Sequence, residues 1–277
     1  MKKVIVLSLI TVLCLPLAVY AASIGGAETQ GKGKFSVGIE QEFVSDRDIK
    51  KKTIVDADGD PTEMNLEIDK MYRSMIKSSY GLLDNLDIYI KLGTADFESE
   101  IDMIWRDIVT GDYCLSKLRA KGDNAFAYGF GIKGKHEFES GWIIGGDFQY
   151  MGHKNDYEGT EPWTDYNAGG NVINSGTAQH EGKITFKAWH IAPYIAKKMG
   201  NFLPYLGVKY SDIETDVKGT FTDSGQSPED FKVKSKADDN FGIFVGTDYK
   251  IGENIALNIE GRFVDETAVS LGMTFKF

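Results

Sequence analysis

The chain has 277 residues, and its 31 Lys and Arg against 41 Asp and Glu give a formal net charge of −10. This acidic balance argues against a nucleic-acid-binding protein, because such proteins need a basic surface. After the first 20 or so residues, no run of 18 or more apolar residues occurs, which excludes a transmembrane helix in the rest of the chain.

Residues 1–21 have the layout of a cleaved secretory signal peptide. Lys2 and Lys3 precede an apolar run, and small residues follow it at Ala21 and Ala22. A membrane anchor is disfavoured because the run is short and a cleavage pattern follows it. We expect cleavage after Ala21, or one residue later, then a short linker at 22–33. Removing residues 1–21 leaves 29 basic and 41 acidic residues, a net charge of −12, and Cys114 as the remaining cysteine, so no intrachain disulfide framework forms.

From residue 34 onward, period-two alternation is the dominant pattern. "KFSVGIEQEF" places Phe35 and Ile39 on one face and Glu40 and Glu42 on the other. "FKAWHIAPYI" can face either way, and we favour His190 and Tyr194 inward. We predict ten strands, at roughly 34–44, 67–82, 86–96, 124–138, 142–153, 182–198, 202–215, 236–250, 254–264 and 267–277.

The connections between these strands alternate in length. Tight turns with Asn or Gly fall at 83–85, 139–141, 199–201 and 252–254, whereas long polar connections occupy about 45–66, 97–122, 154–181 and 217–234. An even strand count with short and long connections at opposite ends is typical of membrane barrels. We therefore predict an all-β fold, a closed antiparallel up-and-down transmembrane β-barrel of about ten strands over 34–277, with eight or twelve as alternatives.

A soluble β-sandwich or lipocalin-like barrel would also alternate, but with its bulky apolar face inward. Here the polar faces combine Gly and Ala with charge, and aromatics gather beside the short turns, which favours lipid outside and a narrow lumen inside. The expected lumen charges, either lining a pore or packed in ion pairs, are Glu40, Arg73, Lys77, Lys91, Lys133, Asp147, Lys209, Asp248, Glu260 and Arg262. A ten-stranded interior is close to the size that side chains alone can fill.

The signal peptide, "SYGLLDNLDIYIKLG" (79–93), "AFAYGFGIKG" (125–134) and "VSLGMTFKF" (269–277) resemble small bacterial outer-membrane barrels of the OmpA-like or opacity-porin type, without a peptidoglycan-binding domain. The resemblance implies a periplasmic carboxyl terminus, a location in the outer membrane of a diderm bacterium, and recognition by the barrel-assembly machinery. The residues matching the assembly signal are Val269, Leu271, Met273, Phe275 and Phe277. Lipopolysaccharide, outer-membrane lipid and periplasmic chaperones are further expected partners, and the barrel is expected to be monomeric.

Three features outside the strands could carry a function. Asp56, Asp58, Asp60 and Glu67 have calcium-loop spacing, but Pro61 replaces the glycine of the sharp turn, so Ca²⁺ is a minor alternative to having no cofactor. His153 and His180 flank the third long connection and could serve a rim-sited enzyme. The aromatics Tyr157, Trp163 and Tyr166 within that connection could instead form a recognition surface.

We therefore expect an integral outer-membrane barrel without enzymatic activity. Its role is a narrow porin-like pore or a structural scaffold that presents extracellular loops. The alternative is a surface adhesin or receptor that binds a ligand through those loops, and an enzyme is the least favoured role.

Overall fold

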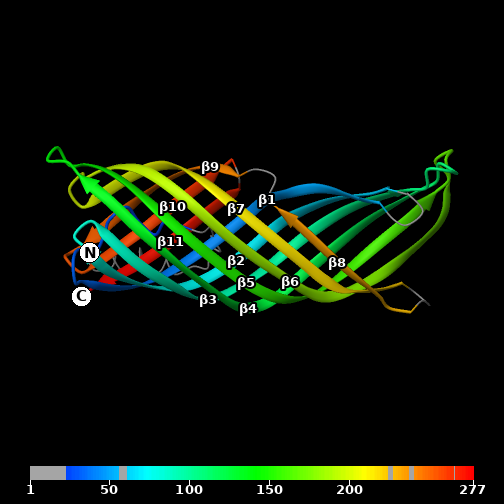
Figure 1. Ribbon diagram of the computed structural model, residues 1–277, viewed down its shortest axis with the longest axis horizontal. Helices are drawn as coiled ribbons and strands as arrows, with labels where there is room; N and C mark the ends of the chain where they lie inside the picture. The colour runs from blue at the N-terminus through cyan, green and yellow to red at the C-terminus, as the bar shows by residue number, and fades with distance from the viewer. Residues whose placement is uncertain (1–22, 56–60, 224–226, 237–239, 265) are drawn as a thin grey trace, which may run out of the picture.

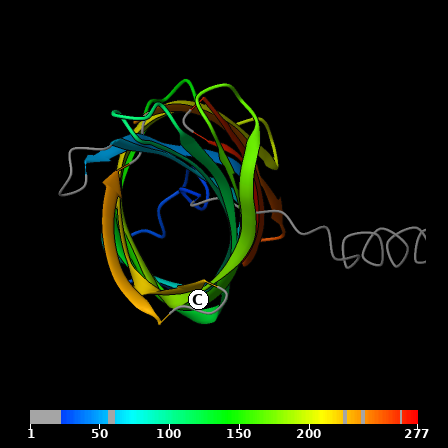
Figure 2. The same cartoon turned by 90° about the vertical axis from the view of Figure 1, so that its right-hand side faces the viewer.

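The computed structural model describes residues 23–55, 61–223, 227–236, 240–264 and 266–277, which form one antiparallel sheet closed into a tube (Figures 1 and 2). None of these residues forms a helix long and apolar enough to cross a membrane. The strands are β1 (Phe35–Val55), β2 (Pro61–Leu83), β3 (Leu86–Arg106), β4 (Tyr113–Glu137), β5 (Trp142–Tyr166), β6 (Val172–Lys197), β7 (Phe202–Asp223), β8 (Glu229–Lys236), β9 (Phe241–Ile251), β10 (Ile255–Phe263) and β11 (Thr267–Lys276).

The sheet closes where the last strand meets the first. β11 pairs with β1 from Ser36↔Lys276 to Asp46↔Thr267, and β6 pairs with β7. Both β8 and β9 pair with β7, each along a different half of it, so together they take one position in the ring. The predicted ten-stranded antiparallel barrel is therefore confirmed.

The predicted long connections are wrong over most of their length, because the strands continue through them. β4, β5 and β6 have 25, 25 and 26 residues. At about 3.3 Å per residue, each spans about 80 Å, whereas about ten residues suffice to cross a bilayer. We call the end with the tight turns and Phe277 the short-turn end, and the opposite end the extended end; in Figure 1 they lie at the left and the right.

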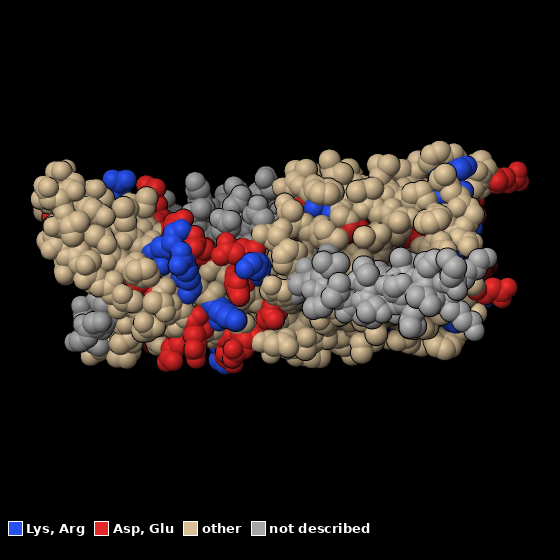
Figure 3. Space-filling view, turned by 180° about the vertical axis from the view of Figure 1, so that it is seen from behind, with Lys and Arg blue, Asp and Glu red and all other residues tan. Residues whose placement is uncertain are grey.

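The polarity of the two sheet faces reverses along the strands. On β3, Ile88 and Leu92 point outward near the short-turn end and Lys91 points inward; further along, Glu98 points outward and Phe97 is buried inside. Figure 3 shows this reversal on the outer surface, seen from behind. Lys, Arg, Asp and Glu gather in a hollowed band, next to a surface with few charges. The apolar outer face of the short-turn half, which we call the apolar belt, has the character of a lipid-facing surface.

Aromatic side chains border the apolar belt on both sides, as they do in membrane barrels. At the short-turn end, Phe35 stacks on Phe277 with ring centroids 6.4 Å apart, and Phe202 contacts Tyr249 at 4.7 Å. At the other border, Phe43 packs on Tyr72 at 5.8 Å. These two bands mark the section of each strand that can lie in hydrocarbon.

The extended half contains a buried apolar cluster in its section next to the apolar belt. Its buried members are Val44, Met71, Phe97, Ile101, Leu118, Ala120, Tyr157, Ile184, Phe186, Val217 and Ala268. Beyond the apolar belt the tube is therefore built like a water-soluble protein, with an apolar interior and charged side chains outside. Tyr157, predicted on an exposed loop, is buried in this cluster.

Candidate functional site

The amino-terminal segment lies inside the barrel, where the sequence predicted a linker. Residues 23–30 run within the lumen of the short-turn half, visible as the blue trace inside the ring in Figure 2. The chain then turns at Gly31–Lys34, where Lys34 N–H donates to Gly31 O (3.1 Å) and Gly33 N–H donates to Gly81 O (2.8 Å), and continues into β1. We call residues 23–30 the amino-terminal plug.

Three lysines from neighbouring strands bind the main-chain carbonyls of the plug. Lys91 Nζ donates to Ser23 O at 3.0 Å, and Lys77 Nζ donates to Ile24 O at 3.2 Å. Lys133 Nζ donates to the carbonyl oxygens of both Ile24 and Gly26. All three lysines are buried, so each ammonium replaces water with a peptide carbonyl or a carboxylate.

Buried carboxylates accept hydrogen bonds from the peptide N–H groups of the plug. Ser23 N–H donates to Glu42 Oε1 (3.0 Å), and Ala27 N–H donates to Asp248 Oδ2 (2.9 Å). Gln30 N–H donates to both oxygens of Asp87, at 2.9 and 3.1 Å. Because a buried peptide group must find partners, this pairing explains how a short segment without regular structure is held in a closed lumen.

The side chains of the plug pack against the opposite wall. Ile24 and Ala27 are buried with apolar and aromatic residues of β5, β6, β7 and β9, which are Ile143, Ala192, Tyr194, Ala196, Leu203, Tyr205 and Phe244. Tyr194 OH also donates to Ala27 O at 3.0 Å. The lumen therefore has a cationic wall for the plug backbone and an apolar wall for its side chains.

At the short-turn end, Glu28 anchors the plug to the barrel mouth. Its carboxylate pairs with Lys250 (2.8 Å), Lys276 (3.4 Å) and Lys198 (3.9 Å). Lys276 belongs to the strand of the proposed assembly signal, and of that signal the structure places Met273, Phe275 and Phe277 on the exposed outer face.

The structure buries all ten side chains predicted as lumen charges. Glu40 pairs with Lys91 (2.6 Å) and Lys77 (3.4 Å), and Lys133 lies 3.9 Å from Asp147. Further along, Arg73 pairs with Glu42 (2.9 Å), while Lys209 and Arg262 share Glu266. Glu260 accepts a hydrogen bond from Tyr205 (2.9 Å), and Asp248 binds the plug.

The predicted set of lumen charges did not include three buried carboxylates of this network, Glu42, Asp87 and Glu266. For Glu42 and Asp87, the alternation of their strands already placed both on the inward face. Glu266 follows a connection and has no such pattern, so only the closed barrel brings it to Lys209 and Arg262.

Small cavities occur inside the tube among the described residues. Two interior cavities of about 20 Å³ each occur, one beside the plug near Gly25 and Tyr89 and one near Val44 and His153. Each has room for about one water molecule. Plug, ion pairs and apolar cluster thus occupy successive sections of the same lumen.

The two candidate histidines are not brought together. His153 is buried, and its Nδ1 lies 2.7 Å from Asn155 Oδ1; His180 is buried beside Glu161. Of the calcium-loop residues, Asp56, Asp58 and Asp60 lie outside the described residues, as does the side chain of Glu67. Within the described part of the chain, no cluster of three or more His, Cys, Asp or Glu could hold a metal ion.

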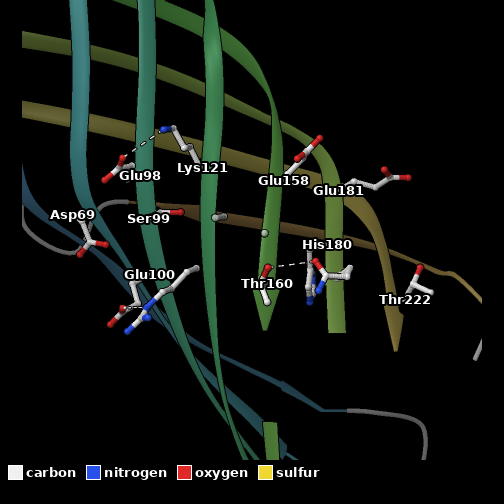
Figure 4. A pocket seen from close by; sticks show the side chains of 14 residues that line it. Asp69, Glu98, Ser99, Glu100, Lys121, Glu158, Thr160, His180, Glu181 and Thr222 are labelled. Atoms are coloured by element: carbon white, nitrogen blue, oxygen red, sulfur yellow. Dashed lines mark hydrogen bonds and ion pairs between the residues drawn. The ribbon is translucent and has the colours of Figure 1, made fainter. Parts of the chain in front are cut away.

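A groove of about 600 Å³ lies beyond the apolar belt, across β2 to β7 (Figure 4). Glu98, Glu158 and Glu181 line it from β3, β5 and β6, and Lys121 on β4 lies 3.9 Å from Glu98. Burial, and then the nearby carboxylates of Glu100 and Glu98, raise the pKa of Asp69. The groove was not predicted, because all of its residues except Asp69 were assigned to three separate long connections.

Comparisons with known proteins agree with the barrel. The sequence model of DUF6588, described as a family of unknown function, matches residues 115–277, which is more than half of the chain. No curated protein matches the sequence.

Among solved structures, the outer membrane protease OmpT from Escherichia coli is 13% identical, with a TM-score of 0.59 over 87% of this chain and 97% of that chain. The outer membrane protein OprG from Pseudomonas aeruginosa is also 13% identical, covering 92% and 99%, with a TM-score of 0.34. At these identities, the likeness to OmpT shows a shared fold and nothing about activity.

Proposed function

We propose that this chain, which belongs to the DUF6588 family, is an integral outer-membrane barrel with a sealed lumen that presents its extended half outside the cell. The apolar belt, the aromatic bands and the barrel fold shared with outer-membrane proteins support the membrane location. The resemblance of the last strand to barrel-assembly signals supports a periplasmic short-turn end.

The observation that carries the proposal is the amino-terminal plug. Eight strands enclose an interior that side chains just fill, so ten strands leave additional space. The plug occupies that space in the short-turn half, and the apolar cluster occupies the lumen of the extended half next to the apolar belt. A scaffold role follows, because solutes would have to displace both fillings to pass.

Conductance in planar bilayers tests this proposal. The purified full-length mature barrel should give no channel steps at moderate voltage. A variant that lacks residues 23–30, with Gly31 as the first residue after the signal peptide, should conduct ions more readily, since it loses the filling between Lys77, Lys91, Lys133 and the opposite wall. Steady channels in the unmodified protein would contradict the sealed lumen, and a deletion variant as silent as the parent would contradict the role of the plug.

The groove favours ligand recognition as a second candidate function. Its volume and mixed charges suit a polar ligand outside the apolar belt. Vesicles carrying the barrel can be tested against a panel of glycans and matrix proteins. Binding that is lost in a double variant, Arg119→Glu with Lys121→Glu, but kept in Lys232→Glu on β8, would support recognition at the groove. Binding that survives the double variant would locate it elsewhere.

A further inference from the structure

We infer that the short-turn half of the lumen contains a binding site for an ammonium group, formed by Glu42 and Glu260, and that the α-ammonium of the processed chain occupies it. The inference deepens the proposed function, because it states how the inner tip of the plug is held. It also makes removal of the leader a requirement for the closed barrel.

The first observation is the position of Ser23. This residue is 1% exposed, and its main-chain nitrogen lies 3.0 Å from Oε1 of Glu42, which is itself fully buried. Ala21 and Ala22, directly before Ser23, are the small residues expected at a signal-peptide cleavage site. Cleavage after either alanine therefore places the new amino terminus at, or one residue from, a buried carboxylate.

The second observation is the balance of buried charge. Among the described residues, six Lys and Arg side chains and seven carboxylates are buried, besides three histidines that carry charge only when protonated. The cations are Arg73, Lys77, Lys91, Lys133, Lys209 and Arg262, and the carboxylates are Glu40, Glu42, Asp87, Asp147, Asp248, Glu260 and Glu266. An uncompensated charge in a protein interior is costly. One α-ammonium supplies the missing positive charge.

The third observation identifies where the charge is needed. Glu42, Ser270 and Glu260 face one another across β1, β11 and β10 in one register row, all pointing inward. Glu42 Oε2 is bound by Arg73, whereas Glu260 Oε1 and Ser270 Oγ have no hydrogen-bond partner among the described residues. An ammonium has three donors, so it can serve Glu42 and these acceptors together.

The fourth observation concerns the space beyond this row. Val44 and Met71, two residues further along β1 and β2, already belong to the apolar cluster of the extended half. Apolar side chains thus begin to occupy the lumen just beyond this row, where Arg262 and Glu266 are buried beside them. A chain that kept its leader would have to pass 21 or 22 more residues through this region, so we infer that processing precedes closure.

Reactivity of the α-amine tests the inference. The mature protein, folded in detergent micelles, is treated with an acylating ester near neutral pH, where α-amines react ahead of lysines, and the amino-terminal peptide is quantified by mass spectrometry. We expect the chain to begin at Ala22 or Ser23 and its α-amine to react at least about tenfold more slowly in the folded barrel than after heat denaturation. A first residue upstream of Ala22, or equal rates in both states, would overturn the inference.

Variants add a second readout. Glu42→Gln should speed acylation in the folded barrel, whereas Glu139→Gln, in an exposed turn, should not. Equal protection in both variants would also overturn the inference. If Glu42→Gln does not fold, the comparison of folded and denatured parent protein still decides. A parent protein that is electrically silent but has a reactive α-amine would refute this inference and leave the sealed lumen standing.

Discussion

Two glycines let the plug backbone approach the lumen carboxylates. Gly25 and Gly26 have φ values of 64° and 91°, in the left-handed region that favours glycine. A Cβ on Gly26 would lie 2.6 Å from Asp248 Oδ1, the side chain that binds Ala27 N–H through its other oxygen. Glycine is therefore needed at position 26, both for the positive φ and because a side chain there would collide with Asp248.

Gly26→Ala should loosen the plug without disturbing the barrel wall. The matched control is Gly33→Ala, because Gly33 also has a positive φ (77°) but has open space around its Cβ position. We expect channel activity in planar bilayers to rise in Gly26→Ala and to stay at the parent level in Gly33→Ala. Equal conductance in the two variants would show that the contact with Asp248 does not matter.

Cys114, in the extended half, should be an unreactive thiol at ordinary pH. Burial, and then the adjacent Asp165 carboxylate, raise its pKa from 9.0 to about 12. Because the thiolate is the reacting form, alkylation should stay slow at pH 9, where only about one thiol in a thousand would be ionised, and accelerate as the pH approaches 12. Asp165→Asn should increase the rate at pH 9. Alkylation at pH 9 as fast as that of a free cysteine would contradict this assignment.

At the scale of the strand, β-bulges explain why four of the strand ends were misplaced. Predicted ends at 44, 67, 96 and 124 fall beside register shifts at Val44/Asp46, Ile68/Lys70, Ala95/Phe97 and Gly122/Ala127. A bulge resets the period-two pattern, and the apolar face turns from lipid to interior at nearly the same level. Alternation alone was therefore sufficient within the apolar belt and failed beyond it.

The lumen site was also predictable only in part: its charged wall was predicted, but its plug was not. The inward charges could be found because a lipid-facing strand must place charge on its other face, so Lys91 and Asp147 stand out from their neighbours. The plug could not be found, because "SIGGAETQ" has no strand or helix period. Its partners come from strands all round the barrel, from β1 to β11, that only barrel closure brings together.

The reversal of polarity predicts opposite effects of one substitution on two outward faces. Ile90 lies in the apolar belt on β3, and Leu115 lies on the outer face of β4 in the extended half; both are exposed. Ile90→Lys should lower the free energy of unfolding in lipid vesicles by about 2–4 kcal/mol, since its ammonium would sit in hydrocarbon. Leu115→Lys should change it by less than about 0.5 kcal/mol, because that site faces water. Urea titration measures both, and equal losses would contradict the position of the apolar belt.

The last strand makes a separate prediction about assembly. Phe277 N–H donates to Phe35 O (2.9 Å), and the two rings stack, but the Phe277 side chain itself is exposed. Phe277→Ala should therefore fold almost normally from urea into detergent micelles, while less of it reaches the outer membrane in cells. Comparable defects in both assays would point to a structural role in place of recognition by the assembly machinery.

At the scale of the whole molecule, the tube has two interiors in series. The short-turn half holds a polar lumen filled by the plug inside an apolar belt, and the extended half holds an apolar cluster inside a charged surface. Strands β1 to β7 run through both halves, whereas β8 belongs to the extended half and β9, β10 and β11 to the short-turn half. Closure of the short-turn half thus involves residues 23–30 as well as the barrel wall.

The most direct test of this account is amide hydrogen exchange of the amino-terminal peptide in the folded barrel, followed by mass spectrometry. The N–H groups of Ala27 and Gln30 donate to the buried carboxylates of Asp248 and Asp87, so a peptide spanning residues 23–31 should stay protected for as long as the transmembrane strands. Complete exchange of that peptide within seconds, while the strands remain protected, would show that the segment lies outside the lumen and that the barrel is not sealed in this way.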